Sequence, residues 1–314
     1  MQIENLAAKI KGQIRSSRYP SIALFADQYL YGHLETFQRY YSLRPNYMLR
    51  AVLQHGWTED TYLADTPLYF KFRRLPILVW SLRFQAKLQA KRGGKIIGIG
   101  SPWAHNVVQN FGLAQQDKIK DKMNKSNRFT ILYFPRHSYH GYPEEHSETS
   151  LISKIRIDYP EARIITSLYW LDFIDPRIRD FYESTSDAVF CPGFSGSLWN
   201  QDPTSLLGGR LTYLSQVRAK IEEADLVVSA YVGTPYWYAL SIGQKVLLGE
   251  EFDRVNDNPQ LKSIFDFYGK DYRVAPFTDK VWVAKQELGF DLVGLKSTKD
   301  VLLSLSSRIS PAKI

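Results

Sequence analysis

The chain has 314 residues, a formal net charge of +8 and a single cysteine, Cys191. This length suits two domains of about 150 residues each, which are large enough to fold around their own cores. One cysteine excludes an internal disulfide framework, and no Cys/His group has the spacing of a zinc site.

The basic excess is concentrated in residues 71–95 and 118–128. A basic surface favours anionic partners: nucleic acid, acidic lipid headgroups, or a phosphorylated or acidic substrate. The chain has no zinc-finger motif, and its aromatic residues are not interleaved with arginines, so nucleic acid is not an expected partner. Binding to an anionic membrane surface is a further expectation.

The sequence also predicts a cytoplasmic protein. If it binds lipid, we expect it to be peripheral at the inner face of the cell membrane. Residues 1–20 are polar and amphipathic rather than signal-like. No apolar run approaches the roughly 20 residues that span a bilayer.

In the N-terminal half, buried strands are expected at 21–26, 49–53, 76–80 and 95–99, and helices at 31–41 and 82–91. Alternation of this kind predicts a parallel sheet covered by helices. Residues 115–128 are polar and charged and are interpreted as a linker, with a basic amphipathic surface helix as the alternative.

The C-terminal half repeats the alternation. Strands are expected at 129–134, 162–168, 188–191, 226–229 and 245–248, and helices at 148–157, 176–183, 211–224 and 235–242. A closing helix is predicted from residue 297, with a capping pattern from Ser297 to Asp300. The fold class is therefore α/β, with two Rossmann-like, doubly wound parallel-sheet domains.

The clearest local pattern is the strand, turn, helix and strand of residues 225–248. We expect Thr234 to be the helix N-cap and Pro235 its first residue. Gly233 would allow a ligand to approach the backbone, and the helix N-terminus favours an anion such as a phosphate.

Ligands of doubly wound sheets lie beyond the carboxyl ends of the strands, so the residues that follow each strand are the candidates for chemistry. Each of them also has an ordinary structural interpretation, and what favours function is their shared position at one predicted edge. The candidates for a nucleotide-phosphate site are His137, Ser138, Tyr169, Gly193, Ser229, Gly233 and Thr234.

In the N-terminal half, the strand at 49–53 leads into His55, Trp57 and Asp60. A histidine or carboxylate at a strand end can act as a general base on a sugar hydroxyl, although His55 could equally cap its own loop. Arg83, after the next strand, would bind an acidic acceptor or lie in solvent. Trp57 and Arg83 are the candidate acceptor-binding residues.

Several motifs are absent. The chain contains no P-loop, no GxGxxG that opens a helix, and no nucleophile elbow, because the GFSGS segment does not lead into a helix. It also lacks an Asp-x-Asp pair that would hold a metal-bound diphosphate. We therefore expect a metal-independent site without a cofactor.

The ordered motifs FPRHS, LYWLDF and DLVVSAYVGTPYWYALSIGQKV, preceded by LQHGW, ILVWSLR and IGSPWAHN, carry a resemblance over roughly residues 47–250. This order resembles capsular and lipopolysaccharide glycosyltransferase-like proteins. More distantly, it is similar to bacterial Kdo- and sialyltransferases and to CDP-glycerol glycerophosphotransferases.

The resemblance implies a GT-B fold, in which an acceptor domain (1–124) and a nucleotide-sugar donor domain (125–296) face each other across a cleft, and 297–314 packs back on the junction. The positions that carry over are His55, then His137 with Ser138, and Ser229 with Gly233 and Thr234. The chain departs from the pattern in its compactness and in its short, basic linker.

The implied function is transfer of a sugar from a nucleotide-activated donor to a glycan or lipid-linked hydroxyl in bacterial surface polysaccharide synthesis. His55 or Asp60 would be the base, and His137 with the amides near Gly233 would stabilise the leaving phosphate. The sequence leaves open whether the donor is CMP- or UDP-linked. The alternatives are transfer of a polyol phosphate from a CDP-linked donor, or non-catalytic binding of a carbohydrate or nucleotide.

Overall fold

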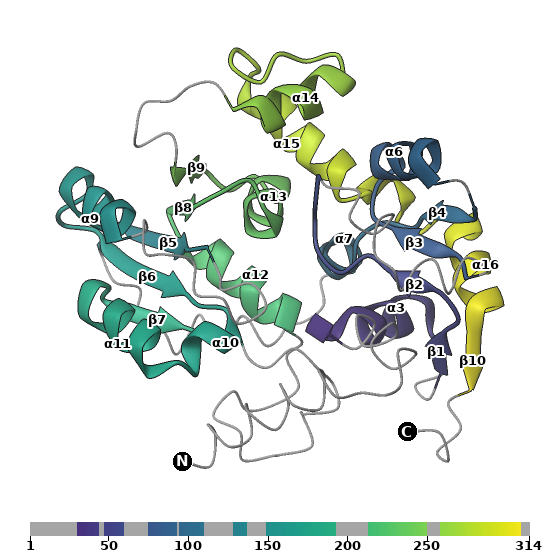
Figure 1. The fold of residues 1–314 in the computed structure, drawn as a ribbon, viewed down its shortest axis with the longest axis horizontal. Helices are drawn as coiled ribbons and strands as arrows, with labels where there is room; N and C mark the ends of the chain where they lie inside the picture. The colour runs from purple at the N-terminus through teal and green to yellow at the C-terminus, as the bar shows by residue number, and fades with distance from the viewer. Residues whose placement is uncertain are drawn as a thin grey trace. The chain divides into compact units, whose positions relative to one another are not determined.

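The computed structural model describes residues 30–43, 47–59, 75–92, 94–109, 128–136, 149–192, 213–249 and 258–308. These residues form two compact units, each with its own parallel sheet. We call them the five-stranded unit and the three-stranded unit (Figure 1). The expectation of an α/β protein with two parallel-sheet domains is confirmed.

The five-stranded unit has the strand order β7-β6-β5-β8-β9, and every strand pairs in parallel with its neighbours. β5 is fully buried, as a central strand covered on both faces must be. The strands are β5 (Thr130–Phe134), β6 (Arg163–Ser167), β7 (Ala188–Phe190), β8 (Leu226–Ser229) and β9 (Val246–Leu248).

Four of the helices that follow these strands agree with the predicted ranges, and two, at 170–173 and 259–267, are not among the predicted helices. The helices are α9 (Thr149–Asp158), α10 (Trp170–Phe173), α11 (Pro176–Thr185), α12 (Tyr213–Glu223), α13 (Thr234–Ser241) and α14 (Pro259–Phe267). The division between the units falls inside α12 and inside α15 (Phe277–Glu287).

The three-stranded unit is built on β2 (Val52–Leu53), β3 (Ile77–Val79) and β4 (Ile96–Gly98), all parallel. Its helices are α3 (His33–Tyr41), preceded by the 3-10 turn η1 (Leu30–Gly32), then α6 (Leu82–Arg92) and α7 (Pro102–Val108). After α15 the chain adds η3 (Phe290–Leu292) and α16 (Lys296–Leu305) to this unit.

The predicted strand at 49–53 is wrong in one respect, because it is two strands. β1 (Tyr47–Leu49) pairs antiparallel with β10 (Ser306–Arg308), whereas β2 joins the parallel sheet. The chain bends at the exposed Arg50, whose backbone N–H donates to the Leu305 carbonyl at 2.8 Å. One apolar run therefore serves two sheets.

The predicted cap of the last helix is also wrong. α16 starts at Lys296, with Leu295 in the cap position and no capping side chain. The helix ends at Leu305 and continues into β10, because pairing with β1 provides partners for the backbone there. Leu302 is fully buried and lies in the same core cluster as Leu49 and Leu53.

No described helix is long and apolar enough to cross a membrane.

A buried histidine joins α3 to α7 in the three-stranded unit. His105 Nδ1 lies 2.8 Å from the Ser101 carbonyl oxygen, and His105 Nε2 lies 3.0 Å from the Tyr41 hydroxyl. Burial lowers the pKa of His105 to about 4, so this imidazole is neutral at physiological pH. Burial also raises the pKa of Tyr41 to about 12. The pair is a satisfied, uncharged part of the core.

The turn after α15 packs against the carboxyl ends of β3 and β4. Gly289 has a left-handed φ of 66°, and a Cβ atom on it would lie 2.0 Å from the Trp80 carbonyl oxygen and 2.8 Å from the Gly100 Cα. The adjacent Leu288 carbonyl accepts a hydrogen bond from the Ser101 N–H at 2.8 Å. Only glycine permits this backbone-to-backbone contact.

We predict that Gly289→Ala lowers the free energy of unfolding by at least about 3 kcal/mol, because it adds both left-handed strain and a steric overlap. Gly269→Ala is the matched control: its φ is 67°, and nothing lies within 4 Å of the added Cβ. That variant should lose only about 1 kcal/mol. Equilibrium urea unfolding measures both, and equal losses would show that the close contact has no energetic role.

Candidate functional site

The five-stranded sheet reverses its direction of growth between β5 and β8. From β5 the chain adds β6 and then β7 on one side, and then β8 and β9 on the other. In doubly wound sheets the crevice at this switch point, beyond the carboxyl ends of the strands, is where ligands bind. Phe134 and Ser229 are paired at this edge, and the Ala230 N–H donates to the Phe134 carbonyl at 2.9 Å.

A cationic side chain that the sequence analysis did not select lies at this switch point. Arg136 follows β5 and is exposed, and its guanidinium carbon lies 5.9 Å from the centre of the Tyr231 ring. The two residues belong to the turns that leave the adjacent strands β5 and β8. The motif FPRHS contains this arginine directly before the predicted site residues His137 and Ser138.

The turn before α13 differs from the prediction in its cap. The N-cap is Gly233, not Thr234, and a glycine has no side chain with which to cap the first turn of the helix. Thr234 is the first helical residue, with Pro235 next to it. A Cβ on Gly233 would lie 2.4 Å from the Tyr231 ring, so that ring occupies the space that a larger residue would need.

Ser229 is fully buried, and its hydroxyl donates to the Tyr231 carbonyl at 2.8 Å. It therefore shapes the turn that leads to Gly233. Tyr169 is partly buried after β6, with its ring centre 5.8 Å from that of Trp170. The predicted site residues His137, Ser138, Gly193 and Asp60 lie outside the described residues.

In the three-stranded unit, His55 lies in the loop that leaves β2. Gln54, which is buried, fixes this loop: its side-chain oxygen accepts from the Trp80 N–H and its amide donates to the Gly56 carbonyl, both at 2.8 Å. His55 is partly buried, and its ring centre lies 5.0 Å from that of Tyr31. Its role as a base stays a prediction.

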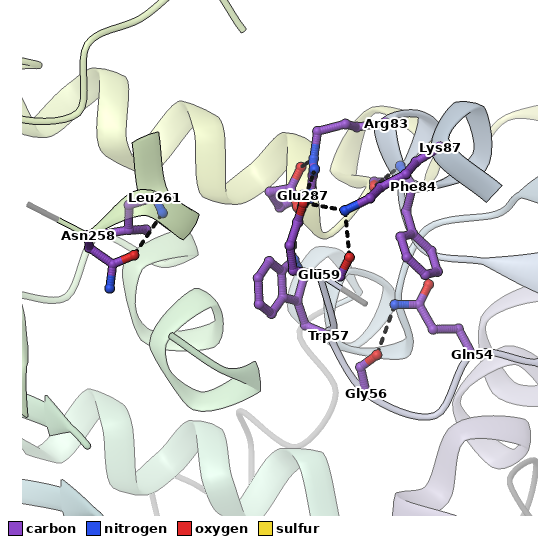
Figure 2. A network of polar contacts seen from close by, with 11 residues as sticks. Gln54, Gly56, Trp57, Glu59, Arg83, Phe84, Lys87, Asn258, Leu261 and Glu287 are labelled. Carbon is purple, nitrogen blue, oxygen red and sulfur yellow. Dashed lines mark hydrogen bonds and ion pairs between the residues drawn. The ribbon is translucent and has the colours of Figure 1, made fainter. Parts of the chain in front are cut away.

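Trp57 and Arg83 belong to a polar network centred on Glu287, as Figure 2 shows. Glu287 Oε2 accepts from Trp57 Nε1 at 2.8 Å, and the Glu287 carboxylate accepts from Arg83 Nε at 2.6 Å and from Nη2 at 2.7 Å. Arg83 also donates to Glu59, at 2.7 and 3.2 Å. Lys87 donates to Glu59 from the exposed side, at 2.5 Å.

The expectation that Arg83 lies in solvent is wrong, because its side chain is 5% exposed. Burial lowers its pKa, but the Glu287 and Glu59 carboxylates more than compensate, so the pKa is raised and the charge is permanent. Burial by itself would raise the pKa of Glu59. The hydrogen bonds from Arg83 and Lys87 outweigh burial, so the pKa of Glu59 is lowered. The network is a closed set of opposite charges.

No protein-family model matches the chain, and no curated protein sequence matches it. Among solved structures, it matches the wall teichoic acid polymerase TagF with 13% identity and a TM-score of 0.34, over 75% of this chain and 55% of that one. The chain thus spans little more than half of that polymerase.

Two further solved structures also match. One is UDP-GlcNAc 2-epimerase from Neisseria meningitidis bound to UDP-GlcNAc, with 13% identity and a TM-score of 0.40, over 81% of this chain and 75% of that one. The other is S. aureus MnaA with UDP, with 10% identity and a TM-score of 0.40, over 85% and 78%.

We predict that Glu287→Ala lowers the free energy of unfolding by about 3–5 kcal/mol, because it leaves the buried Arg83 charge without its main partner. Asp266→Ala, which breaks an exposed pair with Lys262, should lose much less stability. Urea unfolding compares the two variants.

Replacing both charges in the double variant Arg83→Met, Glu287→Leu should recover part of the loss, since no unpaired buried charge remains on either residue. A Glu287→Ala variant as stable as Asp266→Ala would contradict this account of the network.

Proposed function

We propose that the protein is a glycosyltransferase that moves a sugar from a nucleotide-activated donor to a hydroxyl of a glycan or glycolipid in bacterial surface polysaccharide synthesis. The observation that carries the proposal is the edge of the five-stranded sheet. Arg136, Tyr231 and the start of α13, whose N-cap is Gly233, lie at its switch point, where a nucleotide phosphate is favoured.

In this proposal the five-stranded unit binds the donor. Arg136 and the first turn of α13 hold the phosphates, and Tyr169, which follows the adjacent strand β6, contacts the base or the sugar. As the bond from the anomeric carbon to the phosphate breaks, negative charge grows on the leaving oxygen, and donors already in place stabilise it without reorganisation. A cation and a helix N-terminus can perform this function without a metal ion.

In this proposal the three-stranded unit binds the acceptor. His55 is the base that takes the hydroxyl proton, and the loop that carries it is held by Gln54 and by the Trp57–Glu287 hydrogen bond. The two units would work together in a GT-B arrangement, which agrees with the motif resemblance of the sequence.

We predict that at least one nucleotide raises the melting temperature of the full chain in a screen of UDP, CDP, GDP, dTDP and CMP. Arg136→Ala should weaken that nucleotide at least about tenfold, because a charge-assisted hydrogen bond is lost. Arg128→Ala is the control: it removes an exposed arginine near the opposite end of β5 and should change the affinity less than about twofold.

If no nucleotide binds, the proposed function is refuted. If a nucleotide binds equally well to Arg136→Ala, the switch-point site is refuted. Phosphorus in the transferred group would identify a polyol-phosphate transferase instead of a glycosyltransferase, and nucleotide binding without product on a broad acceptor panel would identify a binding protein.

The proposal places the acceptor at an anionic membrane surface. The exposed Lys91, near the end of α6, and the exposed Lys95, just after that helix, would contact this surface. Helix α6 contains no acidic residue that would oppose the contact. Vesicles that contain phosphatidylserine should bind the protein at low salt, and neutral vesicles should not. The double variant Lys91→Glu, Lys95→Glu should bind them several-fold more weakly. Equal binding of both vesicle types would remove the membrane from the proposal.

A further inference from the structure

His33 is a buried polar residue that the sequence analysis did not select. It is the first residue of α3, and two successive left-handed residues bring the chain there, Tyr31 with φ 57° and Gly32 with φ 70°. A left-handed conformation is strained for tyrosine, and strain of this kind is common at functional sites. The turn brings the ring centre of Tyr31 to 5.8 Å from His33 and 5.0 Å from His55.

The imidazole of His33 is enclosed and uncharged. The residue is 1% exposed, and its Nδ1 atom makes no hydrogen bond within the structure described. A buried polar atom in that condition destabilises the folded protein unless a ligand supplies the missing hydrogen bond. Burial, and then the charge of His55, lower the pKa of His33 well below its usual value. At neutral pH His33 therefore offers one N–H donor and one nitrogen acceptor, with no charge.

His33 and His55 lie together beyond the carboxyl ends of β2 and β3. Their ring centres are 6.3 Å apart, and Trp80 lies edge-on to His33 at 6.1 Å. This spacing suits one oxygen atom that hydrogen-bonds to both rings at about 2.8 Å from a nitrogen of each. His55 and Tyr31 are only partly buried, so a ligand approaches the pair from their side.

The chemistry of this cluster favours an uncharged ligand. Arg83, which the sequence analysis considered for an acidic acceptor, has its guanidinium bound to Glu287 and Glu59. The neutral imidazole of His33 and the aromatic rings around it suit a hydroxyl group on a largely apolar ring face, and they do not compensate the charge of a carboxylate or phosphate.

We propose that the His33–His55 pair is the acceptor subsite, that it binds a hydroxyl group of a neutral sugar, and that His33 is a hydrogen-bonding residue of this subsite. The inference rests on the proposed glycosyl transfer and adds the class of acceptor and a residue. The acceptor oxygen forms its bond to the anomeric carbon as the bond to the donor phosphate breaks, and the phosphate keeps the electron pair. The hydroxyl proton moves to His55, while His33 remains neutral.

The test uses the full chain labelled with ¹³C at the histidine Cε1 position, with signals assigned from single-histidine variants. Methyl glycosides of glucose, galactose and N-acetylglucosamine are the neutral probes, and methyl glucuronide is the charged one. At least one neutral glycoside should shift the His33 and His55 signals and bind several-fold more tightly than the glucuronide. The signal of His105, whose nitrogens are both hydrogen-bonded, should stay in place.

His33→Phe keeps a ring but removes the hydrogen bonds, and it should weaken the glycoside about tenfold. His33→Asn restores a donor and an acceptor and should recover part of that affinity, which a purely structural role would not predict. The signal shifts in the unmodified protein test the proposal even if a variant misfolds.

The inference is overturned if no neutral glycoside moves the His33 and His55 signals, if the glucuronide binds as tightly, or if both variants lose the same affinity. Nucleotide binding without any glycoside effect would overturn it and leave the proposed function standing. Glycoside shifts without nucleotide binding would support the subsite and refute the proposed function.

Discussion

The carboxyl edge of the three-stranded sheet depends on one turn from the far end of the chain, residues 287–289. Glu287 compensates the buried charge of Arg83 and accepts from Trp57, Leu288 accepts from the Ser101 backbone, and Gly289 lies against Trp80 and Gly100. Loss of one contact would weaken the others, because an unpaired buried charge at Glu287 or a side chain at Gly289 would displace the turn from the sheet edge. The loop that carries His55 is therefore held by a segment more than 200 residues later in the chain.

The two units carry complementary chemistry at their sheet edges. The five-stranded unit offers positive potential, from the exposed Arg136 and the first turn of α13. The three-stranded unit offers an uncharged imidazole, because burial disfavours the charged form of His33, and its Arg83 is already bound to carboxylates. A transferase that joins a charged donor to an uncharged hydroxyl needs this contrast, since phosphate is attracted to one edge and not to the other.

The site was only partly predictable from the sequence, and the reasons are local. The sequence selects His55 and Gly233 as candidates because each follows a strand, and short apolar runs predict those strands. Arg83 was misjudged as solvent-exposed because nothing near it in the sequence indicates that Glu287 would meet it. His33 was missed because its partners, His55 and Trp80, lie on other elements, and because an isolated histidine at a helix start carries no signal of burial.

The sequence by itself determined the fold class and most element positions, because apolar runs and their turn residues act over ten residues or fewer. It also identified the strand-to-helix turn at Gly233. Tertiary structure decided the rest: that residues 49–53 divide between two sheets, that the last helix ends in a strand, and which charges are paired. Those outcomes depend on contacts between distant segments, whose free energy comes from burial and charge pairing that no short stretch of sequence contains.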